Sequence, residues 1–371
     1  MKLNSRYNFK EKELGKDFAK EKLADFKKLI DASTSFIAMS MPGVGASYFL
    51  KYLACQEFTF FIHIDLYSLP SLTLHEFYKL FLTELGGKTA GKSDEDLFLE
   101  SKEKLLELSQ KNNKIVVIFS RFDQLGKEFD ANFLSNLQSL TTINPGKIVL
   151  IFTSIKPLSE LSPDAVTGGN LTFYSKYLYF KPYSAEDLKK LLKIDPEPTQ
   201  ASLKLDELIK LSGGHYQLLK ILLNSQKEQF ILDQFVKLQM KGLIDYLDYQ
   251  QKKQVQKLAL GKRVEDIDDY LLGVGMIKDN KLFTPLLADY IKANLNIKLP
   301  PKEAKLFRLL RNNMGKIVGK EEIFNALWPN GEGSDWALDA LIYRLRKHPF
   351  IQNQGYIIES HKKIGYTLIQ S

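Results

Sequence analysis

The chain has 371 residues, of which 44% are hydrophobic and 26% are charged, and this balance is typical of a folded protein with two or three domains. Its net charge of +8 at pH 7 permits a polyanionic partner without identifying one. No apolar run approaches the roughly 20 residues of a membrane span, and residues 1–22 are charged throughout, so we expect a cytoplasmic protein with no membrane partner. The single cysteine, Cys55, excludes an internal disulfide, and no Cys/His pair has the spacing of a zinc site.

A glycine-rich turn, MPGVGAS, follows the first predicted strand and precedes a segment with an apolar face at helical spacing. A strand, a glycine turn and a helix N-terminus in this order form a phosphate-binding loop, because backbone N–H groups converge there. Gly43, Gly45 and Ser47 fit this pattern, but Ala46 stands where a lysine normally meets the outer phosphates. The sequence therefore predicts a loop that has kept its shape and lost its charge, and efficient hydrolysis is not expected.

A second segment, Gly86–Ser93, satisfies the phosphate-loop pattern completely, with the sequence GGKTAGKS. The residues before it, Leu74–Leu85, have helical spacing, whereas a phosphate loop must follow a strand. We therefore predict an exposed loop between two helices, with Ser93 as N-cap and with Glu95 and Asp96 in the next helix's first turn.

Short apolar runs alternate with helical patterns through the first half of the chain. The predicted strands are Phe36–Met39, Phe58–Ile64, Lys114–Phe119, Lys147–Phe152 and a fifth over Leu171–Phe180. The helical patterns lie near residues 46–55, 72–85, 94–111 and 129–140. This alternation predicts an α/β domain with a doubly wound parallel sheet, whose ligands bind at the carboxyl ends of the strands.

The ends of the third and fourth strands lack the usual residues of a nucleotide hydrolase. Ser120 and Arg121 stand where Mg²⁺-linked and catalytic acids are expected, and Asp123 is the acid that remains nearby. Thr153 ends the fourth strand, where its hydroxyl would either sense a γ-phosphate or cap a turn. The predicted degenerate nucleotide site comprises Gly43, Gly45, Ala46, Ser47, Asp123 and Thr153. We predict no catalytic residue, doubtful binding of ATP or ADP, and Mg²⁺ only together with a nucleotide.

Residues from about 10 to 230 resemble the signal-transducing (STAND) branch of the AAA+ P-loop ATPases. The resemblance is carried by MPGVGAS, VVIFSRFD, IFTS and SGGHYQLLKILL, although Tyr216 stands where the family usually has proline. It implies a helical lid that follows the sheet and contains the Gly-Gly-His motif.

The last 72 residues, from Pro300 onward, carry eleven Lys/Arg and seven Asp/Glu, a net charge of +4. They read as two helices, a third helix capped by Ser334, and a closing hairpin with Lys362 and Lys363 at its tip. In the third helix, the helical spacing predicts a buried face of Leu338, Leu341, Ile342 and Leu345. The opposite face then carries Ala337, Ala340, Arg344 and Lys347. This order predicts a winged helix-turn-helix.

Residues Pro300–Ile369 resemble the effector domain of OmpR-type response regulators. The matching positions are Ala326-Leu327-Trp328, Leu338-Asp339, Ile342, Arg344-Leu345-Arg346 and Gly365-Tyr366. The resemblance implies that residues 334–347 enter the major groove of double-stranded DNA while the wing touches the backbone or the minor groove. The predicted DNA contacts are Trp336, Ala337, Ala340, Arg344, Lys347, Lys362 and Lys363.

Two departures weaken this expectation, because Trp336-Ala337 replaces the family's usual Arg-Thr pair and Leu341 replaces its histidine. In the alternative interpretation, Arg346 pairs with a nearby acid and the two wing lysines form a solvated turn.

These observations divide the chain into a P-loop ATPase-like domain (1–183), a helical lid (184–234), a winged-helix-like or helical spacer (235–297) with a tight turn at 278–281, and the DNA-binding domain (298–371). They predict a transcription regulator whose degenerate P-loop module senses a signal, forms a homo-oligomer or binds a protein partner. One alternative is a slow NTPase that uses Lys88, Lys92 or Arg121 in place of the missing lysine. The other is a scaffold whose winged helices bind protein.

Overall fold

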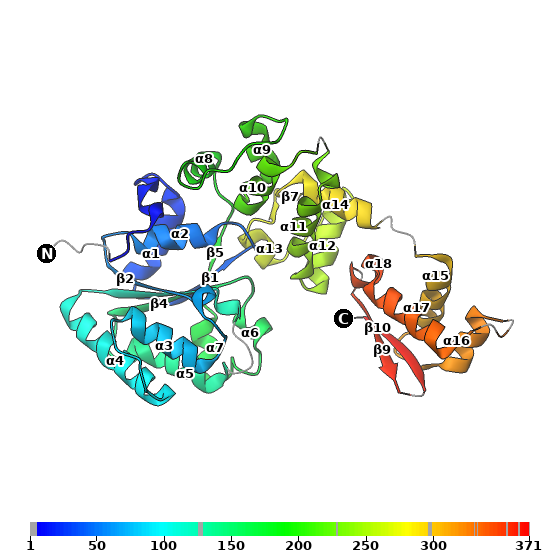
Figure 1. Ribbon diagram of the computed structural model, residues 1–371, viewed down its shortest axis with the longest axis horizontal. Coiled ribbons are helices and arrows are strands. Elements are labelled where there is room, and N and C mark those ends of the chain that lie inside the picture. Colours follow the sequence, from blue (N-terminus) through cyan, green and yellow to red (C-terminus); the bar gives the residue numbers. More distant parts are fainter. Residues whose placement is uncertain are drawn as a thin grey trace. The chain divides into compact units, whose positions relative to one another are not determined.

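A five-stranded parallel sheet is the centre of the first unit in the computed structural model of the chain (Figure 1). The structure describes residues 6–124, 129–227, 229–295, 299–329, 331, 333–353, 355–362 and 364–370. They form two units, one of Met1–Glu228 with Asp269–Met276 and the other of Gln229–Asp268 with Ile277–Ser371.

The strand order of the sheet is β2-β3-β4-β1-β5, and neighbouring strands pair in parallel. The strands are β1 (Phe36–Ser40), β2 (Phe60–Asp65), β3 (Ile115–Ser120), β4 (Ile148–Ser154) and β5 (Tyr177–Phe180). Every residue of β1, β3 and β4 is buried, as expected for the central strands of a parallel sheet covered on both faces.

Helices cover both faces of the sheet, with α1 and α2 on one side and α3, α4, α5 and α7 on the other (Figure 1). Their bounds are α1 (Lys20–Asp31), α2 (Ala46–Ala54), α3 (Leu74–Glu84), α4 (Asp94–Lys111), α5 (Ala131–Ser139), α6 (Leu158–Leu161) and α7 (Gly169–Tyr174). Short 3-10 helices lie at Lys10–Leu14, Leu66–Ser68, Phe122–Gln124 and Leu140–Thr142. The predicted doubly wound parallel sheet is therefore confirmed.

One predicted element is wrong in part. The segment Leu171–Phe180 was expected to be a strand, but its first residues belong to α7 and the strand β5 begins at Tyr177. Contacts with α5 hold the helical turn, because the Asn170 amide donates to the Ala131 carbonyl and the buried Tyr174 hydroxyl donates to the Leu134 carbonyl. Tertiary contacts thus override the strand propensity of an aromatic-rich sequence.

The segment GGKTAGKS is the loop between α3 and α4, as predicted from its context. Ser93 caps α4 and forms a capping box with Asp96, and Glu95 lies in the first turn. Lys92 of this loop forms an ion pair with Glu100 of α4.

A helical lid follows β5. It comprises α8 (Ala185–Ile194), α9 (Leu205–Ser212) and α10 (Tyr216–Asn224), and His215 of the Gly-Gly-His motif is the N-cap of α10. The first unit also includes α13 (Asp269–Gly273), which packs against β5.

The second unit begins with two helices and a short hairpin. These elements are a 3-10 turn (Phe230–Leu232), α11 (Gln234–Asp245), α12 (Tyr249–Ala259), β6 (Ile277–Lys278), β7 (Lys281–Leu282) and α14 (Pro285–Leu295). Asp279 and Asn280 have φ of 52° and 56°, which is the left-handed pair of a tight hairpin turn. The predicted turn at 278–281 is confirmed, whereas the winged-helix identity of 235–297 and the bounds of the four domains stay predictions.

The C-terminal part of the second unit is a winged helix. It contains α15 (Pro301–Asn312), β8 (Val318–Gly319), α16 (Lys320–Leu327), α17 (Asp335–Lys347), α18 (Pro349–Asn353), β9 (Tyr356–His361) and β10 (Gly365–Gln370). Its strands form a sheet in the order β8-β10-β9. The four residues of α17 that were predicted to face inward are at most 2% exposed and join one apolar core with α15 and α16. Within the described residues, no helix is both long and apolar enough to cross a lipid bilayer.

Candidate functional sites

The predicted phosphate loop connects β1 to α2, at the carboxyl end of a central strand. Gly43 and Gly45 have φ of 77° and 101°, a conformation that side chains other than glycine rarely adopt. Among the described residues, no protein acceptor receives the N–H groups of Gly43, Gly45, Ala46 or Ser47. These four donors at the start of a helix form an open cradle that fits phosphate oxygens.

The lid binds the opposite, carbonyl side of this loop. The backbone N–H of Gln217 donates to the Gly43 carbonyl at 3.1 Å, and the N–H of Tyr216 donates to the Val44 carbonyl at 3.4 Å. These two donors belong to the first turn of α10, which has no intrahelical acceptor for them. The first turn of the lid helix and the phosphate loop therefore satisfy each other's backbone groups. We call this set of contacts the lid clamp.

His215 completes the lid clamp. Its Nε2 lies 2.8 Å from the Pro42 carbonyl, and its Nδ1 lies 3.2 Å from the N–H of Leu218. Because a carbonyl only accepts and a backbone N–H only donates, the ring is neutral with its proton on Nε2. Burial lowers the pKa of His215 to about 4, which maintains this state at neutral pH.

Two tyrosines pack against the loop at Gly45. The Tyr183 hydroxyl donates to the Gly45 carbonyl at 2.9 Å. A Cβ at position 45 would lie 2.9 Å from the Tyr183 ring and 3.0 Å from Cβ of Tyr216. Glycine is therefore required here by close packing as well as by its backbone conformation. Tyr216 is the residue that replaces the proline of the family motif.

Asp195 joins the lid to α2 and to the N-terminal segment. Its carboxylate accepts hydrogen bonds from Tyr48 at 2.5 Å, from Lys10 and Lys220 at 3.0 Å each, and from Tyr216 at 3.3 Å. Partial burial opposes ionisation, but these donors outweigh it and hold the pKa of Asp195 well below its usual range. No sequence motif marks this position.

At the end of β3, Ser120 occupies the position of a missing acid. Its hydroxyl lies 3.2 Å from Oδ1 of Asp65 at the end of β2, and 3.1 Å from Nε2 of the buried His63. Burial lowers the pKa of His63 to about 4, so this ring is also neutral near pH 7. Asp65 therefore brings a carboxylate beside Ser120, although no local sequence motif marks it.

Arg121 has a left-handed backbone with φ of 62°, and its N–H donates to the Thr153 hydroxyl at 2.7 Å. Its guanidinium lies 4.2 Å from the centre of the exposed Tyr67 ring. The next residue of β4, Ser154, accepts the N–H of Lys156 and so closes a turn. The structure thus brings Arg121 and Thr153 together at the carboxyl edge of the sheet.

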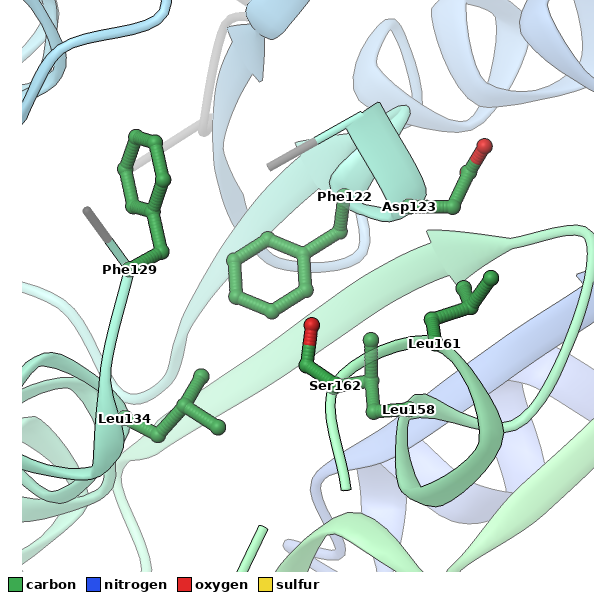
Figure 2. A pocket seen from close by; sticks show the side chains of 7 residues that line it. All are labelled: Phe122, Asp123, Phe129, Leu134, Leu158, Leu161 and Ser162. Atoms are coloured by element: carbon green, nitrogen blue, oxygen red, sulfur yellow. The ribbon is translucent and has the colours of Figure 1, made fainter. Parts of the chain in front are cut away.

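Asp123 lies on the rim of a small pocket beneath the 3-10 helix that follows β3 (Figure 2). The Phe122 ring points into this pocket, whereas the Asp123 carboxylate points away from it (Figure 2). Burial raises the pKa of Asp123 above its usual range. The pocket encloses about 10 Å³, which is room for a single water molecule.

Tyr270 of α13 reaches the same edge of the sheet. It is 5% exposed, and its hydroxyl lies 2.5 Å from the Ile155 carbonyl after β4 and 3.3 Å from the Ser40 carbonyl at the end of β1. This residue is distant in sequence from both strands, and its role was not foreseen.

The residues at this edge fit a nucleotide only in part. The N–H cradle matches phosphate oxygens, but Ala46 supplies no cation to balance their charge. Among the residues that the structure describes, no cluster of three or more His, Cys, Asp or Glu side chains could hold a metal ion.

In the winged helix, α17 has the features expected of a recognition helix. Ser334 caps it by accepting the N–H of Ala337 at 3.2 Å, and its inner face is buried in the core. The outer face carries Trp336, which is 80% exposed, and the exposed Lys347, with the half-buried Ala337 and Ala340 between them.

Tyr343 also lies on this outer face and is 63% exposed. Sequence reasoning missed it, although it lies seven residues after Trp336, three after Ala340 and four before Lys347, and such spacing places all four on one side of a helix. Two large aromatic side chains therefore stand on the face that was predicted to meet DNA.

The arginines of α17 differ from expectation. Arg344 was predicted to face outward, and its side chain is 59% exposed, but its Nε donates to the buried Glu303 of α15 at 2.9 Å. The alternative interpretation paired Arg346 with an acid, but among the described residues this side chain donates to the Ile358 carbonyl and the Ser360 hydroxyl of β9. Lys362 is exposed at the tip of the wing, and Lys363 lies outside the described residues.

The family model described as "Transcriptional regulatory protein, C terminal" matches residues 294–368. This segment contains α15 to α18, β8, β9 and β10 as far as Leu368. Sequence comparison with curated proteins gives no significant match.

Solved structures whose chains follow a similar course have low sequence identity to this protein. The Walker-type ATPase PABY2304 of Pyrococcus abyssi is 16% identical, with a TM-score of 0.47, over 79% of this chain and 98% of its own. The Aeropyrum pernix ORC1 protein, solved in complex with DNA, is 11% identical, with a TM-score of 0.39, over 98% of this chain and 94% of its own. Cdc6p of Pyrobaculum aerophilum is 11% identical, with a TM-score of 0.38, over 99% of this chain and 90% of its own. The fold assignment rests instead on the observed elements.

These elements are the strand order, the phosphate loop after β1 and the helical lid after β5. The chain therefore joins an AAA+-like P-loop ATPase fold to a C-terminal winged-helix domain of the OmpR type.

Replacing Gly45 by alanine should destabilise the first unit far more than replacing Gly91. Both glycines have positive φ, but a Cβ at Gly91 meets no atom within 4 Å, whereas one at Gly45 meets two tyrosines. We expect a loss of about 1 kcal/mol for Gly91→Ala and about 2–4 kcal/mol for Gly45→Ala. Urea denaturation followed by circular dichroism measures both, and equal losses would contradict close packing of the lid on the loop.

The lid clamp should weaken in mild acid. Because burial holds the pKa of His215 near 4 and an unfolded histidine titrates near 6.5, the unfolded chain binds the additional proton between these pH values. Stability should therefore fall as the pH drops through this window, by about 2 kcal/mol per buried histidine between pH 7 and pH 5. His215→Asn keeps an N-cap acceptor but loses the hydrogen bond to the Pro42 carbonyl, so it should lower stability at pH 7. Because it removes the titrating ring, it should also flatten part of this pH dependence. An unchanged slope in thermal melts at pH 5, 6 and 7 would contradict the assignment.

Proposed function

We propose that the chain is a DNA-binding transcription regulator whose P-loop module is catalytically degenerate and acts in sensing or oligomerisation. The observation that carries the proposal is the capped helix α17, with its outer face exposed, inside a segment that matches transcriptional regulatory proteins. A helix of this size enters the major groove, where side chains reach base edges.

The chemistry of the exposed residues supports binding to double-stranded DNA. Lys347 at the end of α17 and Lys362 on the wing offer charges that phosphates can neutralise. Ala337 and Ala340 permit close approach to thymine methyl groups, and Trp336 adds apolar contact area. Arg344 contributes less than its type suggests, because Glu303 already engages it.

The P-loop module supports a sensing role better than a hydrolytic one. Ala46, Ser120 and Arg121 replace three groups that hydrolysis uses, whereas the glycines and the lid contacts remain. An anion in the N–H cradle would act on the loop whose carbonyls the lid holds. The proposed role of this site is therefore binding without turnover.

Specific contacts and exposed residues bear on each of the two alternative functions. For a slow NTPase, Lys92 would have to leave Glu100 and Arg121 would have to leave Tyr67. For a protein-binding scaffold, the exposed aromatic pair Trp336 and Tyr343 is the supporting feature, because such residues are enriched at interfaces between proteins.

The DNA test begins with selection of duplexes from a randomised pool by the full chain, followed by salt titration of an enriched sequence. Lys347→Ala and Lys362→Ala should each weaken binding to all sequences and reduce the salt slope by about one. Trp336→Ala should change the selected sequence more than the salt slope. Lys253→Ala, an exposed change on α12, is the matched control. Unchanged affinity in the Lys347→Ala/Lys362→Ala double variant would favour the scaffold.

The nucleotide test uses isothermal titration with ATP and a phosphate-release assay. The wild-type chain should show no Mg²⁺-dependent turnover, and Ala46→Lys should tighten ATP binding by about 10- to 100-fold by adding a charge-assisted hydrogen bond. Mg²⁺-dependent phosphate release that Lys88→Ala or Lys92→Ala abolishes would establish the NTPase alternative instead.

A further inference from the structure

A groove between α12, the β6–β7 turn and α14 combines positive charge with an apolar floor. It encloses about 600 Å³, within the range of binding pockets. No acidic residue lines the groove. Its four cationic residues are Lys262, Arg263, Lys281 and Lys292. All four are exposed, and none forms an ion pair within the described part of the chain. The groove therefore presents positive charge that its own unit leaves unneutralised.

The floor of the groove is apolar. Leu258 and Leu282 are half-buried, and so is Ala288 of α14. A nucleic-acid backbone would match the cations but would leave this floor without a partner. A segment with both acidic and apolar side chains at helical spacing fits the two features together, because an amphipathic helix lays its apolar side into a groove.

The chain itself carries such a segment on α4. Glu95, Leu99, Glu103 and Leu106 follow one another at steps of four, four and three residues, so they lie on one side of the helix. Leu99 is 50% exposed and Leu106 is 39% exposed, and both acids are exposed. From Glu95 to Leu106, eleven steps along the helix, the stripe is about 16 Å long. We call it the acidic-leucine stripe.

We propose that the acidic-leucine stripe of one copy docks into the cationic groove of a second copy. Leu99 and Leu106 would cover the groove's apolar floor, and Glu95 and Glu103 would meet its cations. The two surfaces differ, so the contact is heterologous, and such contacts continue into rings or open chains rather than stopping at a symmetric dimer.

This inference rests on the self-association part of the proposed function and supplies its interface. Each added copy brings another α17 to the DNA, and linked binding sites raise the overall affinity without any new contact to bases. Complementary charge also makes the association depend on salt, because exposed charges are screened.

The test is sedimentation velocity of the full chain over a concentration series at low and high salt. The wild-type chain should form species larger than a dimer, and they should dissociate at high salt. Lys262→Glu/Arg263→Glu should weaken assembly at least tenfold, and so should Glu95→Lys/Glu103→Lys. Combining both pairs restores opposite charges across the contact and should recover assembly.

Two further variants make the result specific. Lys237→Glu/Lys253→Glu changes two exposed lysines outside the groove by the same total charge and should assemble like the wild type. Leu99→Ser/Leu106→Ser removes the apolar surface that these two half-exposed side chains present, so it should abolish assembly while the chain stays folded, at a somewhat lower melting temperature.

A wild-type chain that is monomeric at every concentration would overturn the inference, and so would failure of the combined charge reversal to recover assembly. DNA binding is measured in parallel at a dilution where the chain is monomeric. Loss of DNA affinity in the groove variant under those conditions would assign the groove to nucleic acid and overturn the inference. Sequence selection that persists without assembly would overturn the inference and leave the proposed regulator intact.

Discussion

The first turn of α10 and the phosphate loop depend on each other for their hydrogen bonds. Each has backbone groups that its own element cannot satisfy, and the lid clamp pairs them through Gly43, Val44 and Pro42. Within the described residues, the N–H groups on the other side of the loop are the donors that this pairing does not use. The conformation of the loop is thus fixed by protein contacts, and no bound ligand is required to explain its two left-handed glycines.

This constraint separates two properties that are usually found together in P-loop proteins. The loop's shape depends on glycines and on the lid, whereas hydrolysis in P-loop proteins uses a lysine and strand-end acids, and this chain has Ala46, Ser120 and Arg121 at those positions. Substitution of the charged residues leaves the lid clamp untouched, because none of its hydrogen bonds uses them. The shape of the loop is therefore independent of the residues at the positions that hydrolysis uses.

Local patterns predicted most of the fold, and contacts between distant segments account for what they missed. Strand and helix positions followed from hydrophobic period, and the flanking helix showed that GGKTAGKS is not a phosphate loop. The turn of α7, the carboxylate of Asp65 beside Ser120 and the Asp195 network depend on partners that lie far away in the sequence. Tyr343 is different, since helical spacing from Lys347 was sufficient to place it on the outer face of α17.

Tyr270 connects the edge of the sheet to a segment whose two ends continue into the second unit. Its hydroxyl is held at Ser40 and Ile155, beside the phosphate loop and the end of β4. The segment that carries it, Asp269–Met276, is joined directly to residues of the second unit at both of its ends. A ligand that displaced the Tyr270 hydroxyl would have to move this segment, because the buried side chain has no freedom to move alone. A displacement of this segment would therefore act on backbone that continues into the second unit at both ends.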